Sequence, residues 1–248
     1  MIIAIVNQKG GTGKTTTTIN LGRGLSESKK RVLLVDMDAQ GSLGYSLGIQ
    51  QAERSMAEVI QGEVAISNII VSRESLDIAP SGVSLADLEL AIADEPNRES
   101  ILKGILDEVK NDYDHILIDC PPSLSLMTIN ALTCADKIII PMQMEVLSLQ
   151  GLDLISDTIE KIRQTSNPDL TVLGILPVML DKRRKLSNEI MEHIRENYDF
   201  QIFSNYIRTN VRASEAPSFG QSVLTYASSS SSAQDYRSFT KELLKTIK

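Results

Sequence analysis

The 248-residue chain contains no tryptophan, only two cysteines and two histidines, and aromatic residues make up 4% of it. It also lacks any run of about 18 or more apolar residues, the length that a helix needs to cross a bilayer, so we expect no transmembrane segment. The first residues, MIIAIVNQ, form a short apolar run without a basic leader or a cleavage site. This run predicts a first strand and not a signal peptide.

The two cysteines, Cys120 and Cys134, have neither the spacing of zinc ligands nor a disulfide framework around them. Both fall in apolar or helical stretches, which predicts buried thiols in a reducing compartment. We therefore expect a cytoplasmic protein.

The charge is acidic overall but unevenly distributed, with a formal net value of −7. Residues 1–181 hold 14 Lys and Arg against 25 Asp and Glu, whereas residues 182–248 hold 11 against 7. The net charge argues against a protein that binds nucleic acid at all times. An acidic body with a basic last quarter is nonetheless a pattern that a nucleic-acid hypothesis has to consider.

Apolar strands alternate with amphipathic helices along the sequence. Helical patterns lie near residues 15–28, 84–94, 100–111, 123–134, 148–165 and 184–197. Near-continuous Ile, Leu and Val runs predict parallel strands covered on both faces at Ile2–Val6, Val32–Asp36, His115–Asp119, Lys137–Pro141 and Val172–Val178. The alternation predicts an α/β fold, a doubly wound and mostly parallel sheet with helices on both faces.

The boundaries are less sharply marked. Asn97 is the candidate start of a helix over Ile101–Val109. The serine run at 228–232 predicts a loop and N-cap before the last helix, with a flexible linker as the alternative. Because there is neither a repeat nor a long linker, we expect one domain over residues 1–248.

The stretch VNQKGGTGKTTTT, residues 6–18, follows the first predicted strand and opens the first predicted helix. Glycines let backbone N–H groups turn inward around a phosphate, and the helix N-terminus adds its positive end. Lys14 would reach the β- and γ-phosphates, and the Thr15 hydroxyl would ligate Mg²⁺. The strict G-x-x-x-x-G-K-[ST] pattern fails at its first position, where Gln8 stands. The setting still predicts a phosphate-binding loop, formed by Gly10, Gly11, Thr12, Gly13, Lys14, Thr15 and Thr16.

Carboxylates follow two of the predicted strands. VLLVDMDAQGS places Asp36 and Asp38 at the end of one, and HILIDCPPS places Asp119 at the end of another. A lone aspartate after a strand is more often an N-cap or turn residue. In a chain with a phosphate loop, these residues match the metal-coordinating and water-positioning carboxylates that phosphoryl transfer requires.

Together, KGGTGKT, DMDAQG and DCPPS resemble the deviant-Walker ATPases of the ParA/MinD group, and more closely the Soj-type ParA partition ATPases. ALTCADKIIIPMQMEVLSLQGL and NVRASEAPSFGQSV also look like that branch, so the resemblance covers nearly the whole chain. The chain starts at the first strand, and on this reading it lacks the N-terminal helix-turn-helix extension of longer ParA proteins.

The resemblance implies roles for the matching residues. Lys9 looks like the signature lysine, which reaches the partner subunit's nucleotide across a dimer interface. Asp38 looks like the residue that orients the attacking water, and Asp36 and Asp119 support Mg²⁺ through its waters. Pro217, in SEAPS, resembles a segment that packs near adenine, and Glu145 resembles an interface glutamate. Chemistry agrees for Lys9, because a cation supplied by a partner subunit stabilises phosphoryl transfer as an arginine finger does.

The family further implies an ATP-bound homodimer that binds non-specific DNA on the nucleoid and works with a ParB-like, centromere-binding adaptor protein. Doubling a weak, salt-sensitive set of phosphate contacts turns negligible binding into useful binding. In the last helix, Arg237, Lys241 and Lys245 share one face, beside an apolar face that predicts docking on the body. The candidate DNA contacts are Arg183, Arg184, Arg208, Arg212, Arg237, Lys241 and Lys245, with Lys182, Lys185 and Lys248 as further basic residues.

Several rival functions remain open from the sequence. A MinD-like membrane-associated ATPase would use YRSFTKELLKTIK as an amphipathic membrane helix, although we expect no stable membrane association. Positioning of a non-DNA cargo uses the same ATPase core. A nitrogenase-type iron protein would need cysteines paired across a dimer, which Cys120 and Cys134 do not fit. An amide-forming synthetase would show ATPase activity stimulated by a metabolite.

Overall fold

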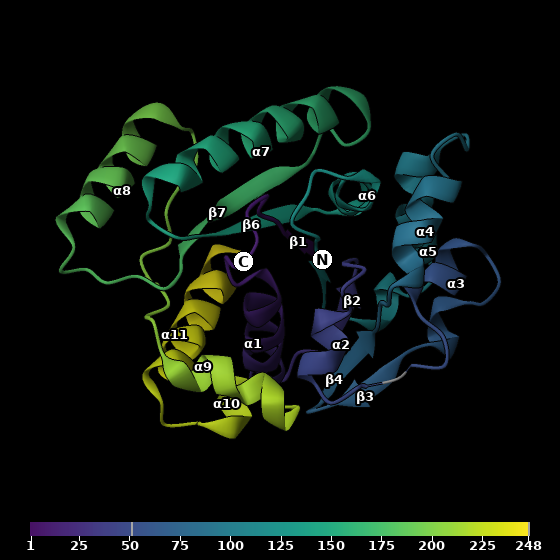
Figure 1. Ribbon diagram of the computed structural model, residues 1–248, viewed down its shortest axis with the longest axis horizontal. Helices are drawn as coiled ribbons and strands as arrows, with labels where there is room; N and C mark the ends of the chain where they lie inside the picture. Colours follow the sequence, from purple (N-terminus) through teal and green to yellow (C-terminus); the bar gives the residue numbers. More distant parts are fainter. Residues whose placement is uncertain (51, 248) are drawn as a thin grey trace.

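The computed structural model describes residues 1–50 and 52–247, and a seven-stranded sheet lies at its centre (Figure 1). The strand order is β3-β4-β2-β5-β1-β6-β7, and every neighbouring pair is parallel except β3 with β4. The strands are β1 (Ile2–Ile5), β2 (Val32–Asp36), β3 (Val71–Arg73), β4 (Leu76–Ala79), β5 (His115–Asp119), β6 (Lys137–Met142) and β7 (Thr171–Pro177). The five predicted strands are confirmed, and β3 and β4 are additional.

Helices cover both faces of this sheet, as predicted (Figure 1). They are α1 (Lys14–Glu27), α2 (Ser42–Ser46), α3 (Met56–Ile60), α4 (Ser84–Ala91), α5 (Ile101–Asp107), α6 (Leu126–Cys134), α7 (Val146–Thr165), α8 (Lys185–Asn197), α9 (Val211–Glu215), α10 (Val223–Tyr226) and α11 (Ser231–Thr246). Successive residues along a strand point to opposite faces of the sheet and pack into two separate hydrophobic cores, one on each face. Ala4 and Leu33 pack with the α4–α8 side, whereas Ile3 and Leu34 pack with α1 and α11.

The start of α5 differs from the sequence prediction. Asn97 has a left-handed φ of 59° and precedes a 3-10 turn over Arg98–Ser100, so it does not cap the helix. Ser100 directly precedes α5, which ends at Asp107 and not at Val109. The extra turn could not be predicted from Pro96, because a proline indicates a helix boundary but does not determine the conformation of the residues that follow it.

The last helix, α11, docks on α1 by its apolar face, as predicted. Tyr236, Phe239 and Leu243 are buried, and Thr240 packs so closely on α1 that a Cβ at Gly24 would clash with its hydroxyl. The serine run supplies the N-cap, since the Ser230 hydroxyl accepts a hydrogen bond from the Ala233 N–H. Glycine at position 24 is therefore required by the close approach of two helices.

Both cysteines are buried and form no disulfide, as predicted. Burial raises the pKa of the Cys120 thiol and raises that of Cys134 to about 12, so neither is a thiolate at neutral pH. Within the described residues, no helix is long and apolar enough to cross a membrane.

Candidate nucleotide site

The loop between β1 and α1 has the conformation of a phosphate cradle. Gly11 and Gly13 have φ of 72° and 74°, in the left-handed region that other residues rarely adopt. A Cβ at either position would meet no atom within 4 Å, so the backbone conformation, and not crowding, requires glycine there. Gly13 directly precedes α1 and accepts a hydrogen bond from the Thr17 N–H at 2.8 Å. The loop therefore ends at a helix N-terminus, where backbone N–H groups favour an anion.

Lys14 lies inside this loop, at the first turn of α1. Its ammonium donates to the Lys9 carbonyl oxygen at 3.3 Å, and its side chain is buried. Burial lowers the pKa of Lys14, and the neighbouring Asp119 opposes that shift. A buried cation with few partners is a suitable ligand for a phosphate oxygen.

A cavity of about 370 Å³ opens above the loop. Its lining consists of the loop, residues that follow β2, β5 and β7, and one residue of α9. Its lining residues are Gly10, Gly11, Thr12, Gly13, Lys14, Thr15, Thr16, Asp38, Ser42, Pro122, Met179 and Ser214. All of the loop residues predicted from the sequence therefore line one cavity.

Asp36 and Asp119 lie side by side, because β2 and β5 pair in parallel with these two residues in register. Both are fully buried. Burial and the charge of Asp119 raise the pKa of Asp36 well above its usual value, and burial raises the pKa of Asp119 to about 7. The two carboxylates that the sequence places at the ends of separate strands therefore lie at the same edge of the sheet.

The hydrogen bonds of this pair leave one oxygen without a partner. Asp36 accepts the N–H groups of Asp38 at 3.0 Å and Leu43 at 3.2 Å. Asp119 accepts the Thr18 hydroxyl through Oδ1 at 3.3 Å, whereas its buried Oδ2 has no partner. Two buried carboxylates with raised pKa values and an unpartnered oxygen fit a nearby cation. No group of three or more His, Cys, Asp or Glu side chains capable of holding a metal alone occurs within the described residues, so phosphate oxygens and water would have to complete the coordination shell.

Asp38 lines the same cavity as the phosphate loop. Its carboxylate accepts the Gln40 N–H at 3.0 Å, and its carbonyl accepts the Gly41 N–H at 2.9 Å. Gly41 has φ of 61° and turns the chain into α2. The tight turn holds Asp38 in the cavity lining, where it is half-buried and accessible to water.

Lys9 is held by its own subunit in this structure. Its ammonium lies 3.1 Å from Glu145 Oε2, and the two side chains are 37% and 45% exposed. Glu145 directly precedes α7, and the Lys9 backbone is fixed by Asn7, whose Oδ1 accepts the Lys9 N–H at 2.9 Å. The two residues that the family resemblance assigns to a dimer interface therefore form an ion pair within one chain.

Pro217 is not part of the cavity lining. It belongs to a 3-10 turn, η4 (Ala216–Phe219), directly after α9, and Ser214 of α9 is the residue that reaches the wall. The sequence interpretation missed Ser214, Met179, Pro122 and Ser42. Ser42 follows β2, Pro122 follows β5 and Met179 follows β7. Ligands of open α/β sheets bind at the carboxyl ends of the strands, and this rule could have identified the three residues from the sequence.

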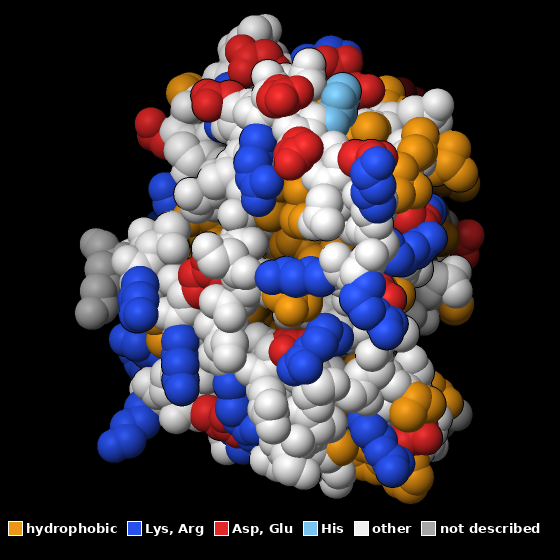
Figure 2. All heavy atoms as spheres, turned by 90° about the vertical axis from the view of Figure 1, so that its left-hand side faces the viewer, with side chains coloured by type: hydrophobic (Ala, Val, Ile, Leu, Met, Phe, Trp, Pro, Cys, Tyr) orange, Lys and Arg blue, Asp and Glu red, His pale blue; other side chains and the backbone are white. Residues whose placement is uncertain are grey.

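The predicted DNA contacts fall into two groups. Four arginines are paired within the chain: Arg183 with Asp181, Arg208 with Asp235, Arg212 with Glu215, and Arg237 with Glu27. Arg184, Lys241 and Lys245 are exposed and form no ion pair in the described part of the chain. Figure 2 shows Lys and Arg side chains spread over the face to which α8 and α11 contribute. Of the further basic residues, Lys182 lies over the Tyr206 ring, Lys185 approaches Glu189 at 3.7 Å, and Lys248 lies outside the described residues.

Three features define the P-loop class of α/β proteins: a mostly parallel sheet, a glycine loop at the carboxyl end of one strand, and carboxylates at the ends of neighbouring strands. This structure has all three. A family model described as an AAA domain matches residues 1–172. The chain is 42% identical to the sporulation initiation inhibitor protein Soj of Bacillus subtilis, over 98% of this chain and 97% of that protein. It is 40% identical to the chromosome partitioning protein ParA of Myxococcus xanthus, over 98% and 88%. The chain therefore belongs to the Soj/ParA family.

A solved structure with a different printed function is also similar. Cobyrinic acid a,c-diamide synthase from Mycobacterium smegmatis, with a bound ATP analogue and magnesium, matches with a TM-score of 0.87 and 35% identity. The match covers 98% of this chain and 94% of that one. The nucleotide-binding fold is thus shared between partition proteins and a biosynthetic enzyme, and the fold alone does not choose between them.

Proposed function

We propose that this chain is a Mg²⁺-dependent ATPase that dimerises on ATP, binds non-specific DNA as the dimer, and positions DNA together with a ParB-like adaptor. The observation that carries the proposal is that Lys14 and Asp38 line one cavity with the phosphate loop, while Lys9 directly precedes that loop and Asp36 and Asp119 end two neighbouring strands in register. Membership of the Soj/ParA family and the ATP analogue and magnesium bound by the similar synthase support the nucleotide and the metal.

Each part of the site within one subunit has a proposed role. Gly10–Thr16 would bind the phosphates, with Lys14 on the β- and γ-phosphate oxygens. The Thr15 hydroxyl would hold Mg²⁺, and Asp36 and Asp119 would hold its water ligands. When bound, Mg²⁺ neutralises the charge that develops on the phosphates. Asp38, which lines the cavity, would orient a water molecule toward the γ-phosphate.

The role of Lys9 requires a second subunit. Lys9 lies on the rim of the phosphate loop and contacts Glu145, outside the cavity lining. Directly after Glu145, Val146 and Leu147 are 58% and 67% exposed, an apolar surface suited to contact with another protein. In an ATP dimer, Lys9 would leave Glu145 and bind the partner's phosphates, so that dimerisation and hydrolysis both need it.

The exposed cations favour DNA as the ligand of the dimer. Arg184, Lys241 and Lys245 have no acidic partner within the described residues, and two such sets would combine across a dimer. The overall charge of −7 would keep a single subunit from binding well. We propose a cytoplasmic protein that associates with the nucleoid only in its ATP state.

Three other functions remain as candidates. The similarity to cobyrinic acid a,c-diamide synthase favours ATP-dependent amide formation. A MinD-like membrane role would need α11 to present its apolar face, whereas Tyr236, Phe239 and Leu243 are buried against the body. Positioning of a non-DNA cargo would use the same site.

The discriminating experiment measures steady-state ATPase activity with separate additions. We expect stimulation by DNA together with the adaptor, and none by anionic liposomes or by carboxylate-bearing metabolites with glutamine as the amide donor. Stimulation by such a metabolite, with consumption of glutamine, would replace the partition function with a biosynthetic one.

A further inference from the structure

The turn between β3 and β4 is strained without an evident local reason. Arg73 pairs with Leu76, so the hairpin loop consists of only Glu74 and Ser75. Both have left-handed φ values, 51° and 61°. Two-residue hairpin loops of this kind strongly favour asparagine and glycine, because other side chains are disfavoured there. A non-glycine pair in this conformation persists only where surrounding structure holds it.

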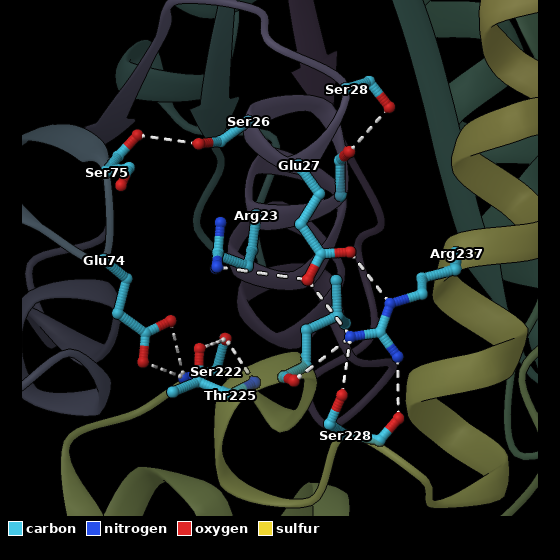
Figure 3. Close-up of polar contacts among 12 residues, drawn as sticks. Arg23, Ser26, Glu27, Ser28, Glu74, Ser75, Ser222, Thr225, Ser228 and Arg237 are labelled. Atoms are coloured by element: carbon cyan, nitrogen blue, oxygen red, sulfur yellow. Dashed lines mark hydrogen bonds and ion pairs between the residues drawn. The ribbon is translucent and has the colours of Figure 1, made fainter.

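Two hydrogen bonds hold this turn, and each leads to a different element. The Glu74 carboxylate accepts the Ser222 N–H, at 3.2 Å and 3.3 Å from its two oxygens, and the Ser75 carbonyl accepts the Ser26 hydroxyl of α1 at 3.0 Å. Figure 3 shows Glu74 pointing at the backbone of Ser222, from the hairpin to the start of α10. Only the first of these bonds depends on a side chain of the turn.

Ser222 is the end of a segment that returns to the nucleotide cavity. It is 1% exposed and caps α10, and eight residues earlier Ser214 forms part of the cavity wall. The segment between them is fixed at its end by two further contacts. The Val223 N–H donates to Asn20 Oδ1 of α1 at 2.8 Å, and Gly220 packs directly against the backbone of Gly48.

Ser214 and Met179 line the cavity but are not part of the glycine loop, to which the proposed function assigns the phosphates. Met179 follows β7, which lies on the other side of β1 from the carboxylate-bearing strands β2 and β5, so we assign the space at Ser214 and Met179 to the base and ribose. What fixes the 214–222 segment therefore shapes the nucleoside end of the site and not the phosphate end.

We infer that Glu74 is a positioning residue for nucleoside binding: its carboxylate, carried on a strained turn, anchors the wall segment through the buried Ser222 N–H. The inference rests on the proposed ATP binding. Replacing Glu74 with glycine removes the anchor and at the same time relieves the strain at that position. ATP affinity should then fall while folding stability changes little. A purely structural role would lower both together.

The experiment measures the dissociation constants of Mg-ATP and of Mg-tripolyphosphate by calorimetry, with the melting temperature of each variant. For Glu74→Gly we expect ATP binding about tenfold weaker, tripolyphosphate binding unchanged, and little change in melting temperature. Ser75→Gly is the matched control, because it relieves the neighbouring strain and keeps both hydrogen bonds. Glu74→Gln should restore ATP binding, since its amide oxygen still accepts the Ser222 N–H.

Two results would overturn the inference. One is unchanged ATP affinity in Glu74→Gly while the wild type binds ATP. The other is an equal loss of ATP and tripolyphosphate affinity, which would indicate a general disturbance of the site. A wild type that binds tripolyphosphate but shows no gain from the adenosine group would instead refute the proposed ATP function itself.

Discussion

Replacing Lys9 with alanine distinguishes ATP binding by one subunit from the dimerisation and hydrolysis that require two. Lys14 is buried in the phosphate loop of its own subunit, whereas Lys9 is half-exposed on the rim and paired with Glu145. We therefore expect Lys9→Ala to leave ATP binding by the monomer nearly unchanged and to abolish ATP-dependent dimerisation and hydrolysis.

The expected size of the effect follows from the contacts exchanged. A hydrogen bond from Lys9 to a charged phosphate contributes about 1.5–3 kcal/mol, and a symmetric dimer has two of them. Giving up two half-exposed Lys9–Glu145 pairs costs about 0.2–1 kcal/mol each. The difference is about 3 kcal/mol, so the dimer dissociation constant should rise about a hundredfold.

The assay is light scattering at micromolar protein with Mg-ATP, in an Asp38→Ala background that keeps the nucleotide intact. Lys29→Ala, which removes an exposed lysine at the far end of α1, is the control. A fluorescent ATP analogue reports binding by the monomer. An unchanged dimer population in the Lys9 variant would refute a role across the interface, and lost monomer binding would mean that Lys9 serves its own subunit.

The remaining predictions concern hydrolysis, pH and the basic surface. Asp38→Ala should bind ATP and accumulate dimers while turnover falls by at least a hundredfold, because only the water is mispositioned; undiminished turnover would refute the assignment. Burial, with help from the N-terminal amine and Lys30, lowers the pKa of His115 to about 4. The unfolded chain therefore binds the extra proton between about pH 6.5 and 4, and the His115 contribution to stability is lost as pH falls through that range. The unfolding free energy of wild type relative to His115→Gln should fall by about 3 kcal/mol from pH 7 to 4. Taking the difference between the two proteins cancels the opposite contributions of the buried carboxylates, and a difference that stays constant with pH would contradict the prediction. Arg237 donates to Glu27 at 2.8 and 3.1 Å and to Ser228 (Figure 3), so Arg237→Met should cost about 1–2 kcal/mol of stability in thermal melts and leave DNA retention by the folded protein unchanged. A selective loss of DNA retention would instead restore Arg237 as a DNA contact.

The sheet was largely predictable because its central strands are continuous apolar runs. Ile2–Ile5 and His115–Asp119 are buried throughout, and such runs have few alternatives to a covered parallel strand. β3 and β4 escaped prediction for the opposite reason. Val71–Arg73 is a three-residue, mostly exposed edge strand, and its turn uses Glu74 and Ser75 in place of the usual Asn-Gly.

The phosphate loop and its carboxylates were predictable because each is a local pattern. Gly11 and Gly13 adopt left-handed φ values, and Asp36 and Asp119 follow buried strands that pair in register. What the sequence could not provide was pairing over long separations. Lys9 meets Glu145 136 residues away, and such contacts are set by the order of strands in the sheet.

The basic residues illustrate the same limit. Helical spacing in the sequence places Arg237, Lys241 and Lys245 on one face of α11. The ion pair between Arg237 and Glu27 becomes evident only in the folded structure. Pairing removes an arginine from the set of free cations, and a count of sequence charges contains no information on it. The free set is smaller than the sequence suggests.

DNA retention in the presence of ATP or ADP tests the central claim most directly. Wild-type protein is passed over immobilised non-specific duplex DNA with Mg-ATP or Mg-ADP at several salt concentrations, with Lys9→Ala as the monomeric control. The account predicts retention with ATP alone, weakening steeply with salt, and none for Lys9→Ala. Equal retention with ATP and ADP, or retention of Lys9→Ala, would contradict a DNA-binding switch built on an ATP dimer.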